Sequence, residues 1–243
     1  MRNPMHGTEF SRNLEQFGSS QPGPYKPEVS SLPETRLSGE EMEQIKKTGT
    51  TTIGLTTPDG VVLATDMRAS LGNMVSSKTV QKVEQIHPRG ALTIAGSVSA
   101  AQSLISTLRA EVNLYETRRG KDMSMQALST LTGNLLRSGA FFIVSPILGG
   151  VDETGNHVYS IDPAGGTTEE EYTVSGSGST FALGVLEQEY SNDLTLDEAK
   201  TVAARGIKSA VERDMASGNG IYLATVTEDG VDIKGHTDFE EVL

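Results

Sequence analysis

The sequence predicts an α+β fold in which two antiparallel sheets lie between two pairs of helices, a four-layer αββα sandwich. The first observation is the order of the elements: strands, two helices, strands, two helices, strands. The second is that short β-rich runs are joined by turn sequences, and the third is that the long segments carry an apolar stripe at helical spacing. Helix pairs that are segregated from antiparallel strands favour such layers.

The strands at the start of the domain form two expected hairpins. The first hairpin turns at Pro58-Asp59-Gly60 and the second at His87-Pro88-Arg89-Gly90, both rich in turn-forming residues. The four expected strands are Thr51–Thr57, Val61–Asp66, Val80–Ile86 and Ala91–Gly96.

Four helices are expected from the spacing of apolar residues and from the residues at their ends. The first ends at Arg118-Arg119-Gly120, which is typical of a helix C-terminus. The last begins with Thr195 and Glu198 at the spacing of a capping box. The expected ranges are Ser99–Thr117, Ser124–Gly139, Ser179–Ser191 and Leu196–Met215.

Further strands are expected between the two helix pairs and at the end of the chain. They are Phe141–Gly150, His157–Ile161, Glu171–Ser175, Ile221–Val226 and Gly230–Lys234. The last two are expected to form a closing hairpin, followed by an acidic tail.

Residues 1–49 differ from the rest of the 243-residue chain. They hold five of its nine prolines and little apolar periodicity, so we expect a disordered leader with a short helix at Gly39–Lys46. An ordinary disordered tail is the alternative. The 194 residues that follow suit one domain with a substantial core.

Composition excludes several classes of function. The net charge is −12, and residues 50–243 carry 25 acidic against 14 basic side chains, which disfavours binding to nucleic acid or anionic membranes. An acidic, lysine-poor chain fits a high-salt cytoplasm, and it also fits an ordinary acidic protein.

The chain has no cysteine, no apolar run of about 18 residues and no apolar segment of a secretory signal. Neither a metal-ligand cluster nor a phosphate loop is found, so no cofactor is expected, and His6, His87, His157 and His236 have no expected role.

The stretch from Lys47 to Gly54 lies where the leader meets the domain. By itself it is a β-branched run that leads into a strand. A cut between Gly49 and Thr50 would leave Thr50 with both a hydroxyl and a free α-amine. Such an amine titrates near about 7.7–8.0 and can act as the base that the weakly nucleophilic hydroxyl needs. Gly49 lacks a Cβ, which would allow the backbone to bend for self-cleavage.

Six short motifs follow one another along the chain: Thr48–Gly54, Ala64–Ser70, Lys82 at 32 residues after Thr50, Ile94–Ser97, Gly176–Ser179 and Arg213–Gly218. In this order they resemble the motifs of the proteasome β subunit in its archaeal form, a family of N-terminal nucleophile hydrolases. The resemblance extends over residues 47–238 and implies the αββα fold of that family.

The resemblance implies a role for one or two residues in each motif. Thr50 would be the nucleophile that cleavage after Gly49 exposes, and the N–H of Gly96 would line the oxyanion hole. The remaining members of the implied catalytic set are Asp66, Lys82, Ser177, Asp214 and Ser217. Asp66 would hold Lys82 in its charged form, and the others would form a polar network around the Thr50 amine. Without the resemblance, Lys82 reads as a strand-surface lysine, Asp66 as a turn residue and Asp214 as a helix-capping residue.

The resemblance also implies a substrate and an assembly. Four apolar residues would surround the first specificity pocket and favour cleavage after hydrophobic residues: Ala69, Val80, Ile94 and Val98. Heptameric β rings would stack between α-subunit rings in the cytoplasm and degrade unfolded polypeptide supplied by an ATPase ring, with the leader masking the site until assembly. The alternatives are a non-catalytic ring subunit and an N-terminal nucleophile amidase that acts on small amides.

Overall fold

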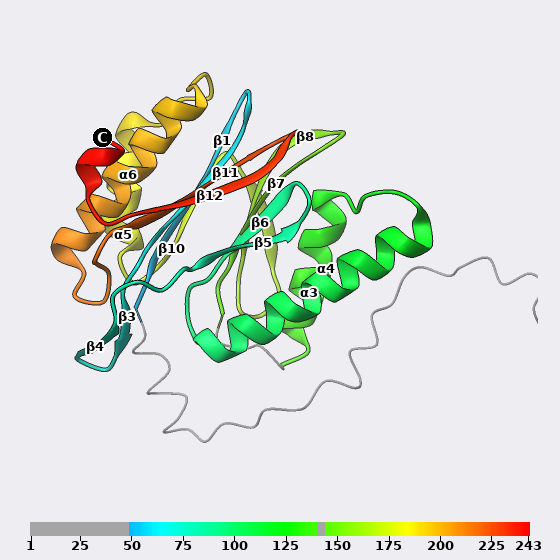
Figure 1. Ribbon diagram of the computed structural model, residues 1–243, viewed down its shortest axis with the longest axis horizontal. Helices are drawn as coiled ribbons and strands as arrows, with labels where there is room; N and C mark the ends of the chain where they lie inside the picture. Colours follow the sequence, from blue (N-terminus) through cyan, green and yellow to red (C-terminus); the bar gives the residue numbers. More distant parts are fainter. Residues whose placement is uncertain (1–48, 140–143) are drawn as a thin grey trace, which may run out of the picture. The chain divides into compact units, whose positions relative to one another are not determined.

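The computed structural model describes residues 49–139 and 144–243, all within the unit Leu32–Leu243. The predicted leader, the helix at Gly39–Lys46 and the start of the strand expected at Phe141 lie outside the described residues. Within them the predicted four-layer sandwich is confirmed, with two five-stranded antiparallel sheets between two helix pairs (Figure 1). No helix in these two ranges is long and apolar enough to cross a membrane.

The first sheet has the order β10-β1-β2-β11-β12. Its strands are β1 (Thr51–Thr57), β2 (Gly60–Asp66), β10 (Tyr172–Gly176), β11 (Ile221–Thr227) and β12 (Gly230–His236). Helices α5 (Ser179–Glu189) and α6 (Leu196–Arg213) cover its outer face, where buried residues such as Ile53, Leu186 and Ile207 form one apolar cluster. The capping box predicted at Thr195 and Glu198 is present at the start of α6.

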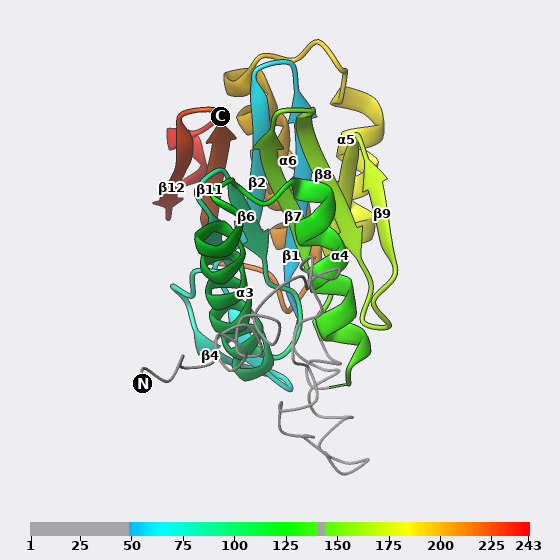
Figure 2. The ribbon, with the colours of Figure 1, turned by 90° about the vertical axis from the view of Figure 1, so that its right-hand side faces the viewer.

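The second sheet has the order β5-β6-β7-β8-β9. Its strands are β5 (Val83–His87), β6 (Gly90–Thr93), β7 (Ile147–Asp152), β8 (Gly155–Ile161) and β9 (Thr167–Glu170). Helices α3 (Val98–Arg119) and α4 (Met125–Arg137) lie on its outer face, and Figure 2 shows both in front of this sheet. Between the sheets, Val61, Leu63, Ile147 and Val158 belong to a second apolar cluster.

Several predicted boundaries in the second sheet are wrong. The strand expected at Phe141–Gly150 is Ile147–Asp152 within the described residues, and the one expected from His157 begins at Gly155. The strand expected at Val80–Ile86 begins at Val83, because the Val80 N–H bonds instead to the carbonyl of Met67, at 3.0 Å, as the chain crosses from the first sheet. The strand expected to end at Gly96 ends at Thr93, and Gly96 has a φ of 121°, which a side chain would strain.

Three strands were not predicted. Hairpin β3 (Ala69–Leu71) and β4 (Met74–Ser77) turns at Gly72, and β9 is an exposed Thr-Thr-Glu-Glu edge strand. None of them has a buried face, so their sequences lack the alternation that marks a strand. Helix α6 ends at Arg213 rather than Met215, with Asp214 as its C-cap, and a short 3-10 helix, η2 (Phe239–Glu241), closes the chain.

Candidate active site

The predicted site residues on the first sheet all lie at one end of it. In the strand register Thr51, at the start of β1, pairs with Gly176 at the end of β10. Asp66, at the end of β2, pairs with Ile221 at the start of β11. Thr50, Asp66 and the segments after Gly176 and before Ile221 therefore meet, although more than 100 residues separate the first two from the others.

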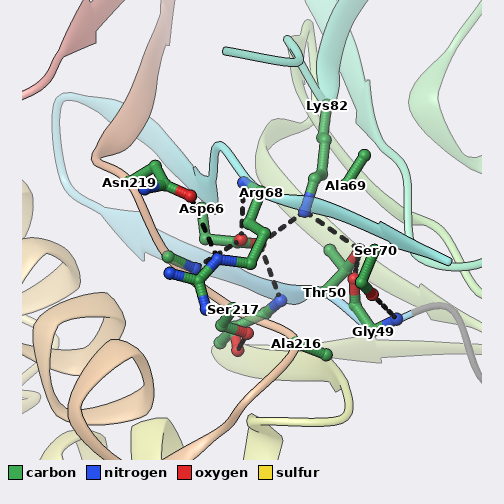
Figure 3. Close-up of polar contacts among 12 residues, drawn as sticks. Gly49, Thr50, Asp66, Arg68, Ala69, Ser70, Lys82, Ala216, Ser217 and Asn219 are labelled. Atoms are coloured by element: carbon green, nitrogen blue, oxygen red, sulfur yellow. Dashed lines mark hydrogen bonds and ion pairs between the residues drawn. The ribbon is translucent and has the colours of Figure 1, made fainter. Parts of the chain in front are cut away.

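Asp66 is fully buried and is the hub of this end of the sheet (Figure 3). Its Oδ1 accepts hydrogen bonds from the Thr51 N–H at 3.0 Å and from Lys82 Nζ at 2.7 Å. Its Oδ2 accepts from the N–H groups of Arg68 and Gly218, each at 3.0 Å. Four donors satisfy the buried carboxylate, so it fixes the start of β1, the backbone at Arg68 and Gly218, and the Lys82 amine.

Lys82 bridges Asp66 and Thr50. Its Nζ lies 2.7 Å from Asp66 Oδ1 and 3.1 Å from Thr50 Oγ1, and only 6 % of its side chain is exposed. The reading as a strand-surface lysine is therefore wrong. Burial lowers the pKa of Lys82, although the Asp66 carboxylate opposes this shift. A lower pKa increases the neutral fraction of the amine, which can accept a proton from the Thr50 hydroxyl.

Thr50 is buried and is joined to Gly49 by an intact peptide bond. Its hydroxyl donates to the Gly49 carbonyl oxygen at 2.6 Å, and its N–H donates to Ser177 Oγ at 3.2 Å. A Cβ on Gly49 would lie 1.9 Å from the Cβ of Ala216 and 2.7 Å from Ser177 Oγ. Any side chain at residue 49 would therefore clash with Ala216 and Ser177, which explains the glycine at this position.

A chain of hydroxyl groups leads from Thr50 to Asp214. Asp214 Oδ2 accepts from Ser177 Oγ and from Ser217 Oγ, each at 2.6 Å, and Thr51 Oγ1 lies 2.7 Å from Ser217 Oγ. The backbone N–H of Asp214 also bonds to the Ala210 carbonyl and closes α6. Its helix-end position and its contact with the serines thus occur together.

Gly96 lies on the cavity side of the segment that follows β6. The Ser145 N–H donates to the Ala95 carbonyl at 2.9 Å, the pattern that turns the N–H of Gly96 away from its bridge partner Val144. Two residues earlier, the Ile94 N–H donates to the Lys82 carbonyl. Gly96 lines the same cavity as Thr50 and Lys82, so its N–H is a candidate donor to a group bound beside the nucleophile.

A cavity of about 420 Å³ opens beside Thr50. All four residues predicted to surround a specificity pocket line it, as do Lys82 and Gly96: Ala69, Val80, Ile94 and Val98. The cavity also has polar residues on its wall that sequence reasoning did not identify: Gln81, Glu84, Gln102, Ser106 and Arg109. Gln102, Ser106 and Arg109 occupy exposed positions of α3, and Gln81 and Glu84 lie just before and in β5, so their positions resemble any solvated surface and no pattern marks them in the sequence.

Three further residues of the site had no predicted role. Arg68 donates from Nε to Asn219 Oδ1 at 3.0 Å and from Nη1 to the Met215 carbonyl at 2.8 Å, so it holds the loop that carries Ser217 (Figure 3). The Ser70 hydroxyl accepts from the Gly49 N–H at 3.3 Å, and Thr51 extends the hydroxyl chain. Arg68 and Ser70 lie within the Ala64–Ser70 motif, which was the available signal.

The three histidines that the structure describes lie outside the cavity. His87 is buried with Nε2 at 3.4 Å from Glu116, His157 lies between Asp152 and Glu169, and His236 contacts Glu241; His6 is outside the described residues. Across residues 49–139 and 144–243, no three His, Asp or Glu side chains gather as metal ligands would.

Comparison with known proteins identifies relatives along the whole chain. The profile of the family described as "Proteasome subunit" matches residues 46–226. A "Proteasome subunit beta" of Halorubrum lacusprofundi is 70 % identical over 94 % of this chain and 95 % of its own length. Proteins with the same description from Natrialba magadii and Haloferax volcanii are 62 % and 65 % identical, over 100 % and 99 % of both chains. The chain therefore belongs to the proteasome subunit family and, within it, to the archaeal β subunits.

Proposed function

We propose that this β subunit is the precursor of a threonine endopeptidase that cleaves itself after Gly49 and then hydrolyses polypeptides with Thr50. One observation carries the proposal. The Thr50 hydroxyl lies 2.6 Å from the carbonyl oxygen of the bond to be cut and 3.1 Å from the amine of Lys82, in a buried site.

In self-cleavage, Thr50 Oγ1 adds to the Gly49 carbonyl carbon and its proton passes to the deprotonated form of Lys82, which burial makes more accessible by lowering the pKa of the amine. The C–N bond to Thr50 then breaks, Lys82 returns the proton to the departing nitrogen, and an ester links Gly49 to the Thr50 side chain. Water hydrolyses the ester and releases the Gly49 carboxylate. The α-amine does not yet exist at this stage, so Lys82 is the base in contact with the hydroxyl.

In peptide hydrolysis, the new α-amine of Thr50 serves as the base, because such amines titrate near about 7.7–8.0. In the precursor this nitrogen already bonds to Ser177 Oγ, which donates to Asp214, so the same network would hold the amine in place. The N–H of Gly96 would stabilise the oxyanion, and a donor of this kind contributes about 2.7–4 kcal/mol to catalysis.

The apolar part of the cavity would receive the side chain that precedes the cleaved bond. Ala69, Val80, Ile94 and Val98 line it and none is charged, which favours cleavage after hydrophobic residues. We expect faster cleavage of apolar model peptides than of acidic or basic ones, and the reverse order would contradict this preference.

The names of the relatives, "Proteasome subunit beta", support assembly of this chain into a proteasome core. We propose heptameric β rings between α rings in the cytoplasm, an ATPase ring that supplies unfolded polypeptide, and a leader of residues 1–49 that masks Thr50 until assembly.

The deciding measurement is the intact mass of this subunit recovered from assembled particles. The expected chain begins at Thr50 and has 194 residues. Thr50→Val should keep the leader, because it removes the nucleophile and retains the shape. The matched control is Thr52→Val: within the described residues the buried Thr52 hydroxyl has no hydrogen-bond partner, so this variant should be processed normally.

Two other outcomes would favour the alternatives. A full-length chain in complete particles would contradict the proposed protease activity and favour a structural ring subunit. A processed chain that hydrolyses simple amides and leaves casein intact would favour the small-amide hydrolase.

A further inference from the structure

The cavity beside Thr50 has two chemically different ends. Lys82 contacts the nucleophile at one end, and four other polar side chains line the cavity along β5 and α3: Glu84, Gln102, Ser106 and Arg109. A pocket that accepted only aliphatic side chains would have no use for these polar groups, so their placement relative to Thr50 matters.

The strand β5 places Glu84 farther from Thr50 than Lys82. Residues 82 and 84 point to the same face because side chains alternate along an extended strand, and both line the cavity. Lys82 contacts Thr50, and Glu84 lies about 6–7 Å farther along the strand, which is roughly the length of a tyrosine side chain.

Helix α3 shows the same gradient on the opposite wall. Val98, Gln102, Ile105, Ser106 and Arg109 line the cavity at spacings that place them on one helix face. The helix begins just after Gly96, and Arg109 lies about 16 Å farther along its axis than Val98. The apolar residue is therefore next to the oxyanion donor and the arginine is at the far end.

Glu84 and Arg109 neutralise each other at that end. Arg109 donates to Glu84 Oε2 at 2.9 Å and, from Nε, to the Gln85 carbonyl at 2.8 Å. A cationic substrate side chain would meet the guanidinium, and an anionic one would meet the carboxylate. Glu84 Oε1, the Gln102 amide and the Ser106 hydroxyl remain as partners for a neutral group that can donate a hydrogen bond.

We propose that this polar end, with Glu84 as its main acceptor, makes the pocket select tyrosine over phenylalanine before the cleaved bond. This inference rests on the proposed function and narrows its substrate class. Because Gln102, Ser106 and Arg109 are exposed, water competes for the phenol. The preference should therefore be about tenfold in kcat/KM, at the low end for a hydrogen bond to a charged group.

The test compares five fluorogenic peptides that differ only in the residue before the cleaved bond: Tyr, Phe, Leu, Lys and Glu. Assembled particles containing the processed native subunit should cleave the Tyr peptide about tenfold faster than the Phe peptide, in kcat/KM. In Glu84→Leu the Tyr-to-Phe ratio should fall to about one, and in Glu84→Gln, which keeps a neutral acceptor, it should lie between the two values. Glu240→Leu removes a glutamate from a surface ion pair with Lys208 outside the cavity and should leave the ratio unchanged.

Each outcome separates the two proposals. Cleavage of the Phe peptide with an equal rate for Tyr, or a ratio that survives Glu84→Leu, overturns the polar-end inference and leaves the protease intact. A best rate with Lys or Glu also overturns it. If processed particles cleave none of the peptides, the proposed function fails and the inference fails with it.

Discussion

Two ion pairs lie two residues apart along β5 and its approach, and burial separates what they do. Asp66 and Lys82 are 2.7 Å apart with 0 % and 6 % of their side chains exposed, whereas Glu84 and Arg109 are 2.9 Å apart with 30 % and 46 % exposed. In the buried pair, each partner stabilises the charge and the position of the other, because water does not reach either group to solvate it. The exposed pair can form hydrogen bonds with a substrate side chain, because the pair leaves part of the hydrogen-bonding capacity of Glu84 unused.

The largest expected effect comes from breaking the buried pair with Lys82→Met. The buried Asp66 carboxylate would lose the cation that contacts it, so the free energy of unfolding should fall by about 3–5 kcal/mol. Self-cleavage would lose its base and should slow by about 10²–10⁴-fold. Denaturant unfolding and a time course of intact mass would measure these two effects.

The matched control for that change is Lys208→Met. Lys208 pairs with Glu240 at 3.2 Å on the surface, with 40 % and 76 % of the side chains exposed, so its loss should change stability by less than about 1 kcal/mol. Processing of Lys82→Met at the native rate would show that the lysine only supports the fold.

The second effect tests how tightly the buried side of the comparison is packed. Gly49→Ala would bring a Cβ to within 1.9 Å of the Ala216 Cβ, and overpacking of this kind costs about 1–3 kcal/mol. The Thr50 hydroxyl would move from the Gly49 carbonyl, and processing should slow. Combination with Ala216→Gly should restore part of the rate, as followed by intact mass.

The control for this variant is Gly184→Ala, since a Cβ on Gly184 meets no atom within 4 Å and the residue lies inside helix α5. It should be processed normally. Equal processing of Gly49→Ala and the native chain would contradict the steric account.

The sequence allowed prediction of the layers, because the buried strands are runs rich in β-branched and apolar residues, hairpin turns have characteristic residues and helices carry apolar stripes. It did not reveal β3, β4 and β9, whose side chains are mostly exposed and so carry no periodic pattern.

The candidate site also has a part that the sequence predicted and a part that it did not. The residues in the short motifs were named because they resemble a family, whereas their meeting at one end of the first sheet depends on strand register. The link from Thr51 to Ser217 and the polar end of the cavity arise from tertiary contacts between segments far apart in sequence, which no local spacing encodes.

A third carboxylate, Asp152, has 8 % of its side chain exposed, a value between those of the two ion pairs. Its expected effect on stability is smaller and depends on pH. Burial alone would raise the pKa of Asp152, but hydrogen bonds from the Thr154 hydroxyl and from the N–H groups of Met125 and Thr154, with nearby His157, lower it to about 2 from 3.8. A lowered folded-state pKa stabilises the protein above the unfolded pKa. This contribution, about 2 kcal/mol, should be lost as the pH falls from about 4 through 2.

Asp152→Asn should remove that part of the pH dependence, as measured by urea unfolding at several pH values on particles or subunits in one state of assembly. Thr154→Val, which removes one donor, should reduce it by less. A native slope between pH 4 and 2 in Asp152→Asn would show that other carboxylates dominate acid unfolding.

The smallest expected effect comes from breaking the exposed pair with Arg109→Met. Water already reaches both partners, so the free energy of unfolding should fall by less than about 1 kcal/mol, and the difference should shrink in 1 M salt, where screening extends over only about 3 Å. Denaturant titrations at low and high salt would measure it beside Lys82→Met. A loss of 3 kcal/mol or more would mean that the exposed pair supports the fold as the buried one does. Burial would then no longer separate the two pairs, and the polar end of the cavity would be part of the scaffold rather than a surface left open for substrate.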